Sequence, residues 1–144
     1  MEQCERHLDE SGARDTEIEA FLTQYLLIVF CAEVEQIVHG LVREMADSSE
    51  DVKLASFTKG AMRNVLRGVK KEQLSGLLGL FREAGKTEWS EALTEQDVSR
   101  YSSAIGARND VAHAHGATMT FREIKEAVEC TYRILESFKV VLEH

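Results

Sequence analysis

Proline is missing altogether from this chain of 144 residues, and glycine occurs only 9 times. Proline breaks helices, because its ring removes an N–H donor and collides with the preceding turn. Most of the glycines lie at the ends or seams of segments with helical periodicity, where they favour the end of a helix. No strand pattern, repeat or low-complexity segment is found. We therefore expect an all-α protein whose helices are joined by short turns.

Cysteine and long apolar runs are also scarce. The three cysteines, Cys4, Cys31 and Cys130, are widely separated and outside any C-x-x-C pair, so neither a disulfide framework nor a zinc site is expected. The longest uninterrupted apolar stretch, Tyr25–Ala32, is far shorter than the roughly 20 residues that span a bilayer. The first residues also lack the basic-then-apolar layout of a signal peptide. These absences predict a soluble, cytoplasmic protein without a membrane partner.

A chain of this length, with 44% hydrophobic residues, can form one hydrophobic core but is too short for two domains of ordinary size. Residues 1–14 are polar and aperiodic, which predicts a flexible tail before a single helical domain over residues 15–144. Capping boxes of the form S/T-x-x-E at Thr16 and Thr120 predict the starts of two long helices. The expected architecture is an antiparallel four-helix bundle with a short additional helix between residues 48 and 93. Periodicity predicts helices over about 16–46, 50–67, 71–84, 94–115 and 120 to nearly the end, with a connector at 86–93 that contains about one turn of helix.

Charge is distributed unevenly, although the formal net charge is −8. The segment Lys53–Lys71 carries six basic and no acidic side chains, so the rest of the chain holds 11 basic and all 25 acidic ones. Basic residues four apart share a helix face, and such a row indicates a surface for the RNA backbone. The alternative is a solvated helix face that balances acidic neighbours. We call the following residues the basic row: Lys59, Arg63, Arg67, Lys70 and Lys71.

The segment Arg108–His113 brings together a permanent cation, an amide and a titratable imidazole. These are the groups needed to hold a phosphodiester and to move protons around it. Asn109 and His113 share a helix face, whereas Arg108 is turned by about 100° from Asn109. Because Gly116 is suited to end the helix, His113 lies near a negative helix end that favours a protonated imidazole and hence a general acid. The alternative is a purely structural role, since such residues are common at helix ends.

A site built from this segment alone needs a second polar wall. On the first long helix, Glu33 and Glu35 flank the apolar row around Val34, and either carboxylate can fix the arginine or the imidazole through a charge-assisted hydrogen bond. That helix also has more apolar surface than one neighbouring helix covers, which predicts a homodimer whose second copy completes the site. A metal site at His113-x-His115 is a weaker alternative, because no third ligand stands at a supporting spacing. No cofactor is expected, since no glycine-rich phosphate loop is present.

The R-N-x-x-x-H pattern of Arg108, Asn109 and His113, late in an all-helical chain, resembles the signature of the HEPN superfamily. Residues 32–38 of the first long helix and residues 120–124 of the last are most similar to the RiboL-PSP type of HEPN domain. The resemblance implies a helical bundle that acts as a metal-independent endoribonuclease in toxin–antitoxin, abortive-infection or CRISPR-linked defence. It also implies an active site assembled across a homodimer.

Matching positions carry the family's roles onto this sequence. Arg108 and His113 take the catalytic roles, Asn109 takes a supporting one, and Glu35 corresponds to an acidic residue on the first helix. Some toxin members have a tyrosine two residues after the histidine that a partner nucleotidyltransferase modifies, whereas this chain has His115 there, which argues against that regulation. The expected partners are RNA, a second copy and a cognate antitoxin or other regulatory protein. The alternative is a non-catalytic HEPN module for RNA binding or dimerisation.

Overall fold

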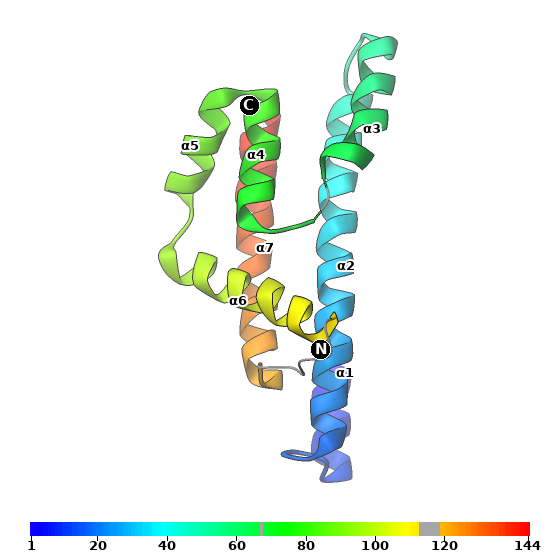
Figure 1. Ribbon diagram of the computed structural model, residues 1–144, viewed down its shortest axis with the longest axis vertical. Helices are drawn as coiled ribbons and strands as arrows, with labels where there is room; N and C mark the ends of the chain where they lie inside the picture. Colours follow the sequence, from blue (N-terminus) through cyan, green and yellow to red (C-terminus); the bar gives the residue numbers. More distant parts are fainter. Residues whose placement is uncertain (67, 113–118) are drawn as a thin grey trace.

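A computed structural model describes residues 1–66, 68–112 and 119–144, apart from the side chains of residues 63 and 112. Over these ranges the chain forms seven α-helices and no strand, which confirms the expected all-α class. Figure 1 shows the helices in chain order from blue to red. Their bounds are α1 Glu2–Ser11, α2 Glu17–Asp47, α3 Val52–Val65, α4 Lys71–Phe81, α5 Glu83–Ala92, α6 Glu95–Ala112 and α7 Phe121–Glu143.

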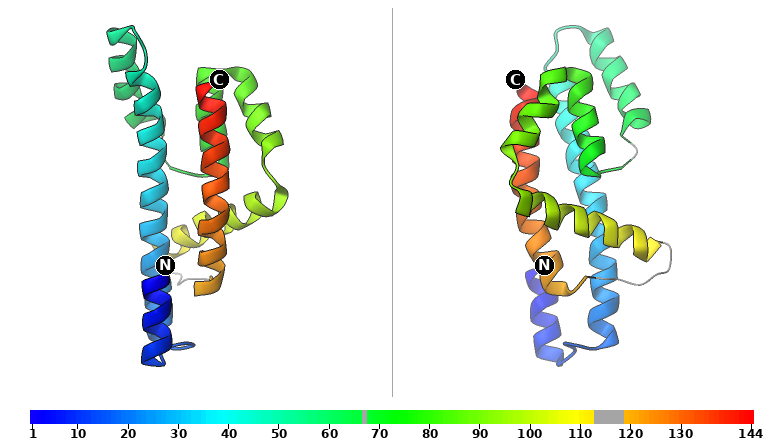
Figure 2. Two further views of the ribbon diagram at one scale, coloured as in Figure 1. Left: turned by 180° about the vertical axis from the view of Figure 1, so that it is seen from behind. Right: turned by 60° about the vertical axis from the view of Figure 1, so that its left-hand side comes forward.

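The two longest helices, α2 and α7, run parallel and side by side, and α6 packs across both (Figures 1 and 2). α2 buries residues that follow one another at helical spacing, among them Leu27, Val34 and Val38. α7 buries a similar row that includes Ile124 and Phe138. Apolar burial against one another and against α6 therefore forms the main core of the molecule.

Threonine caps begin both long helices, as the sequence predicts, but only one of the two forms the full capping box. At α7, the Thr120 hydroxyl accepts from the Glu123 N–H at 3.3 Å, and the Glu123 carboxylate accepts from the Thr120 N–H at 2.7 Å. At α2, the Thr16 hydroxyl accepts instead from the Ile18 N–H at 3.3 Å. Each hydroxyl satisfies an N–H group that the first helical turn leaves without a backbone partner.

The segment 86–93 is more helical than the expected connector with about one turn of helix, because most of it belongs to helix α5. Trp89 of α5 is fully buried, and its ring meets that of Phe138 edge-on with the centroids 5.7 Å apart. The Trp89 Nε1–H donates to the Ser137 hydroxyl at 3.0 Å. Burial of one large aromatic side chain thus holds α5 against α7, where a sequence pattern of apolar residues is lacking.

Residues 1–14 are not the flexible tail that their polarity predicts, because residues 2–11 form helix α1. Leu8 of this helix is fully buried and packs in a small apolar cluster with Ala13 and with Phe121 of α7. This cluster is separate from the main core. Residues 2–11 therefore belong to the packed part of the chain.

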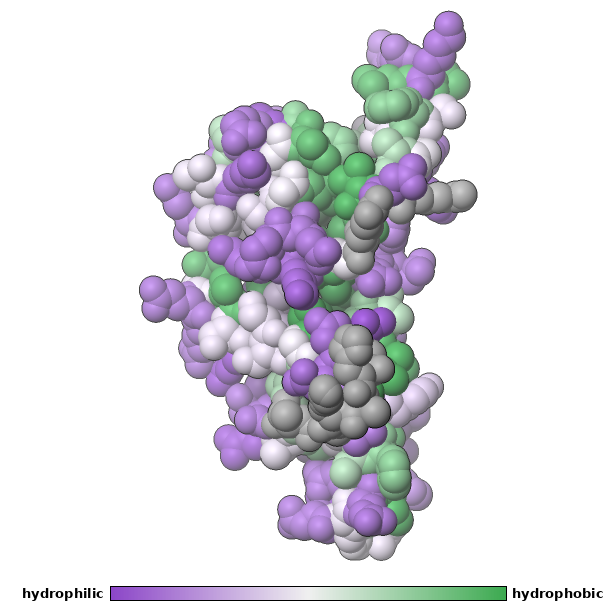
Figure 3. Space-filling view, viewed as in Figure 1, coloured by the Kyte–Doolittle hydropathy of each residue, from purple (hydrophilic) through white to green (hydrophobic). Residues whose placement is uncertain are grey.

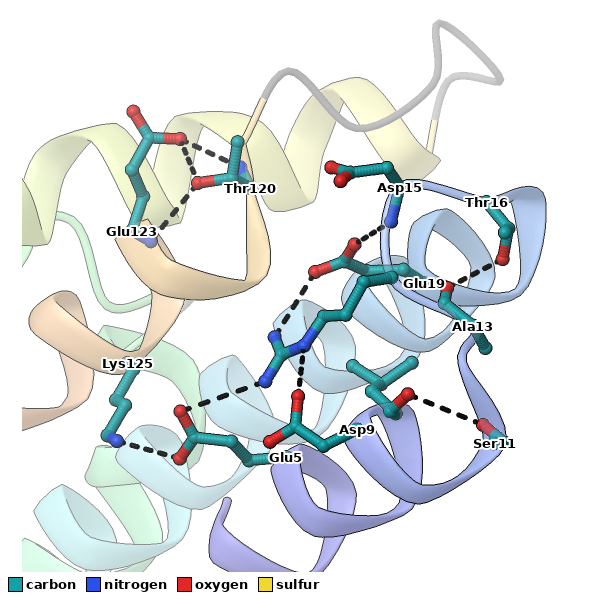
Figure 4. A network of polar contacts seen from close by, with 12 residues as sticks. Glu5, Asp9, Ser11, Ala13, Asp15, Thr16, Glu19, Thr120, Glu123 and Lys125 are labelled. Carbon is teal, nitrogen blue, oxygen red and sulfur yellow. Dashed lines mark hydrogen bonds and ion pairs between the residues drawn. The ribbon is translucent and has the colours of Figure 1, made fainter.

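Ion pairs also connect α1 to its neighbours, as Figure 4 shows. The Arg14 guanidinium pairs with Asp9 at 2.7 Å and approaches Glu19 of α2 at 3.5 Å. Lys125 of α7 pairs with Glu5 of α1 at 2.7 Å. Such solvent-accessible pairs contribute little to stability individually. The buried Leu8 is therefore the main energetic link between α1 and the rest of the domain.

Helix α3 ends at Val65, before the end expected near residue 67, and Gly68 does not provide a left-handed cap for it. α3 packs chiefly against α2. Between α3 and α4 lies an apolar groove of about 400 Å³, which forms part of the green surface in the upper half of Figure 3. Among the residues that line this groove are Leu54, Phe57, Val65, Leu80 and Phe81.

Helix α2 is, within the described ranges, the one helix long and apolar enough to cross a membrane, with an 18-residue window of mean hydropathy 1.6. Core helices pass the same test of length and composition, and α2 packs against α3, α6 and α7. Only 33% of that window is buried inside the protein. The apolar surplus lies on the exposed side of the helix, which carries Ile18, Phe21, Tyr25 and Ile28.

Leu8→Ala is expected to lower the free energy of unfolding by about 2–5 kcal/mol, because truncating a fully buried leucine loses its burial and leaves a cavity. Chemical denaturation followed by circular dichroism measures the change. His7→Ala, at the neighbouring exposed position, is the control and should alter stability by less than about 0.5 kcal/mol. Equally small effects of the two substitutions would mean that α1 contributes nothing to the stability of the domain.

Candidate active site

Three parts of the chain surround a polar cleft of about 410 Å³. The end of α6 meets α2, and the linker from α3 to α4 passes near this meeting point (Figures 1 and 2). The cleft therefore takes side chains from α2, from α6 and from the linker with the first turn of α4. Its lining residues are Cys31, Glu35, Gly68, Val69, Lys70, Gln73, Ile105, Arg108 and Asn109.

Helix α6 presents Arg108 and Asn109 to the cleft because the earlier part of the helix is firmly packed. Tyr101, in the middle of α6, is 1% exposed. At the first turn, Asp97 pairs with Arg133 of α7, and this hydrogen-bonded guanidinium lowers the pKa of the Asp97 carboxyl. Both contacts fix the direction of α6, so its last turns reach the cleft with two polar side chains half-buried.

The structure separates the two acidic candidates on α2. Glu35 lines the cleft together with Arg108 and Asn109. Glu33 lies instead beside a small pocket between α2 and α7, near Tyr132. Positions two apart on a helix differ by about 200°, so the two carboxylates cannot face the same site. Of the two alternatives that the sequence leaves open, Glu35 is the one that shares a cleft with Arg108 and Asn109 of α6.

Two opposite charges act on the buried thiol of Cys31 in this cleft. Burial raises the pKa of Cys31 to about 11, the Arg108 guanidinium acts to lower it, and the Glu35 carboxylate acts to raise it. The thiol therefore stays protonated and unreactive at neutral pH. Arg108 Nη1 also lies 3.5 Å from Asn109 Oδ1, a long contact. Arg108 and Asn109 thus offer donors to a ligand, while Glu35 offers an acceptor.

A hydrogen bond connects the linker wall of the cleft to α6. The Tyr101 hydroxyl donates to the backbone carbonyl of Val69. Burial raises the pKa of Tyr101, so the phenol remains a protonated donor at all ordinary pH values. The bond holds Val69, and with it the adjacent Lys70, beside the helix that carries Arg108.

The prediction that the basic row lies along one helix is wrong, because α3 ends at Val65 and the row does not continue on this helix. Lys70 lies in the linker and lines the cleft, whereas Lys71 is the first residue of α4 and is not among the lining residues. Arg67 and the side chain of Arg63 lie outside the described part of the chain. The row is thus divided between two helices and the linker between them.

Lys59 lies away from the cleft. Its ammonium group pairs with Asp47 near the end of α2. It also borders a separate cavity of about 370 Å³ between α2 and α3, beside His39 and Arg43. The position of Lys59 therefore fits the alternative interpretation, in which a basic side chain balances an acidic neighbour.

His113 and His115 lie outside the described residues. Helix α6 ends at Ala112, directly before His113 in the sequence. Over the ranges that the structure describes, no group of three His, Cys, Asp or Glu side chains is arranged to hold a metal ion. The described part of the cleft therefore consists of Glu35, Arg108, Asn109 and their neighbours.

Sequence reasoning missed Cys31 and Gln73 as residues of this cleft. Cys31 belongs to the apolar row of α2 and is correctly interpreted as buried, but burial alone does not show that it borders a polar cavity. Gln73 is at the third position of α4, where a side chain often bonds back to the residue before the helix. That local signal predicts a helix start, whereas its place in the cleft depends on how the linker packs against α6.

The family model of RiboL-PSP-HEPN matches residues 2–144, which include α1 and every helix after it. The chain therefore belongs to the RiboL-PSP-HEPN family, and HEPN domains are generally associated with ribonuclease activity. No curated protein and no solved structure matches the chain.

Tyr101→Phe is expected to lower the free energy of unfolding by about 1–3 kcal/mol, because it leaves the buried Val69 carbonyl without the hydroxyl that donates to it. Urea denaturation measures the loss. Tyr132→Phe removes a hydroxyl from a side chain that is 63% exposed and should change stability by less than about 0.5 kcal/mol. Equal stability of the two variants would contradict the importance of the Tyr101 bond.

The stability of the Tyr101→Phe variant should also depend on pH differently from that of the unmodified protein. Because burial raises the pKa of Tyr101 in the folded state, folding favours the protonated phenol. The stability that this provides is fully present below the ordinary tyrosine pKa of about 10 and is lost as the pH rises from there toward the raised value. The unmodified protein should therefore lose more stability than Tyr101→Phe does when the pH rises from 9 to 11, roughly the range that brackets this ordinary pKa.

Proposed function

We propose that the protein is a metal-independent endoribonuclease that cuts RNA at the cleft between α2 and α6. The observation that carries this proposal is that Glu35, Arg108 and Asn109, from two helices far apart in sequence, line one cleft. A guanidinium, an amide and a carboxylate suit the binding of a phosphodiester and the proton transfers of its cleavage. Membership of the RiboL-PSP-HEPN family supports the same class of reaction.

In the proposed reaction, the 2′-oxygen of a ribose forms a bond to the adjacent phosphorus while the bond from phosphorus to the 5′-oxygen breaks. His113, the residue after the end of α6, accepts the proton of the 2′-hydroxyl and supplies one to the departing 5′-oxygen. Arg108 stabilises the negative charge that builds up on the phosphorane-like transition state. Asn109 orients the scissile phosphate, and Glu35 fixes the arginine or the imidazole through a charge-assisted hydrogen bond.

We also propose a biological setting for this activity. A ribonuclease that cuts cellular RNA harms the cell unless it is controlled, so the protein acts as a cytoplasmic toxin or defence effector under the control of a cognate antitoxin or other regulatory protein. The support for this setting is the family to which the chain belongs. Lys70, which lies in the cleft, is the member of the basic row best placed to hold the RNA backbone there.

The exposed side of α2 supports a homodimer. Ile18, Phe21, Tyr25 and Ile28 are between 48% and 67% exposed, and their alternating spacing of three and four residues places them on one helix face. Glu35 lies seven residues after Ile28 and therefore belongs to the same face. An apolar surface on α2 thus leads directly to the cleft. Two-fold pairing over this surface would place the second copy beside the first copy's Glu35.

Arg108→Ala and His113→Ala are each expected to reduce RNA cleavage by at least about two orders of magnitude, the usual result of losing a transition-state charge partner or an acid–base group. Cleavage of labelled RNA under single-turnover conditions measures the loss. Wild-type cleavage should tolerate EDTA and leave 2′,3′-cyclic phosphate and 5′-hydroxyl ends, the products of internal attack by the 2′-oxygen.

Two controls make this test interpretable. Circular dichroism should show unchanged helical content in both variants, and His115→Ala should reduce cleavage much less than His113→Ala. Full activity of folded His113→Ala protein would contradict the mechanism. A wild-type protein that binds RNA without cutting it would instead support a non-catalytic HEPN module.

Phe21→Glu combined with Tyr25→Glu is expected to convert the homodimer into a monomer, because it places two charges in the centre of the exposed apolar face of α2. Light scattering at micromolar concentration measures the mass against the 16.2 kDa of one chain. Phe57→Glu on α3, where the phenylalanine is 72% exposed, is the control and should leave the dimer intact. A monomeric wild-type protein, or disruption by Phe57→Glu alone, would contradict this interface.

A further inference from the structure

Gly68 lies in the linker before α4, and the backbone conformation there does not require a glycine. Among the described glycines, Gly12 is the one whose φ lies in the left-handed region, so the backbone at Gly68 is one that other residues also adopt. A Cβ atom at position 68 would lie 2.7 Å from Oε1 and 3.2 Å from Nε2 of Gln73. The absent side chain therefore leaves space for the Gln73 carboxamide at the edge of the cleft.

The orientation of this carboxamide is fixed by the start of α4. Gln73 Oε1 accepts from the Lys70 N–H at 3.0 Å, and the Gln73 N–H donates to the Lys70 carbonyl at 2.9 Å. A carboxamide has one accepting oxygen and one nitrogen with two donors, so the Lys70 N–H determines which end faces the backbone. Nε2 is then the end that can donate to a ligand in the cleft.

The charged groups of the cleft already suit a phosphate. Arg108 and Lys70 bring positive charges to it, and cationic side chains supply most of the affinity for a nucleic-acid backbone, whatever its sequence. A neutral amide adds little to that attraction. It does distinguish bases, because it bonds only to a base edge that has an acceptor in the right place.

We propose that Gln73 determines base specificity by donating from Nε2 to an acceptor on the base next to the cut phosphate, with Gly68 providing the space that keeps the carboxamide in position. This proposal rests on the proposed RNA-cleaving function of the cleft. The ligand is single-stranded RNA, because the base edges of a paired strand are already engaged.

Binding of labelled homopolymers of uridine, cytidine and adenosine tests the proposal, with fluorescence anisotropy as the readout. Every protein is full-length and carries His113→Ala, so that the RNA is not cut. The ratio of the weakest Kd to the tightest measures base preference. Gln73→Ala is expected to lower this ratio by about fivefold to tenfold. Gly68→Ala should do the same, because its Cβ displaces the carboxamide, and the double variant should lose no more than either single one.

Gly76→Ala in α4, where a Cβ would meet nothing within 4 Å, is the matched glycine control and should leave the ratio unchanged. Lys70→Ala should weaken binding to all three homopolymers alike and reduce its salt dependence. An unchanged ratio in the Gln73 and Gly68 variants, or equal weakening on all homopolymers, would overturn base recognition by Gln73 while leaving RNA binding intact. If the His113→Ala reference protein binds no homopolymer, the proposed function fails and the role of Gln73 fails with it.

Discussion

The burial of one side of α2, which includes Leu27, Cys31 and Val34, against α6 and α7 fixes the direction of every other side chain on that helix. Successive helical residues are turned by about 100°, so Ile28 and Glu35, seven positions apart, share one face of α2. This face is exposed at Ile28 and borders the cleft beside α6 at Glu35. The same packing places the Cys31 thiol between the influences of Arg108 and Glu35. The chemistry of the cleft and the exposed apolar face of α2 are thus two results of one packing arrangement.

Local signals in the sequence were sufficient for the features that depend on neighbouring residues. The capping box at Thr120 predicts the start of α7, and helical periodicity predicts the long helices α2 and α7. The spacing around Arg108 and Asn109, together with the family resemblance, predicts that an acidic residue of α2 shares their cleft. The helix predictions succeed because helix start and side-chain direction follow from residues only a few positions apart, whereas the catalytic roles of Glu35, Arg108 and Asn109 stay predictions.

Features that depend on distant residues could not be predicted in this way. Helix α1 is polar except for positions such as Leu8, whose partner Phe121 is at the far end of the sequence. Helix α5 owes its position to Trp89 and its contacts with α7. The place of Gln73 in the cleft depends on a linker whose course is fixed by the Tyr101 hydroxyl. In each case the deciding contact is tertiary, so the periodicity of the sequence does not predict it.

The hydrogen bond from Tyr101 to Val69 separates the cleft mechanically from α3. Because α3 packs chiefly against α2 while the linker is held by α6, a change in α3 does not have to move the residues of the cleft. Evolution can therefore lengthen, shorten or exchange this segment without rebuilding the site. The turn between α2 and α3 is accordingly a place where a reporter domain can be inserted with little effect on the cleft.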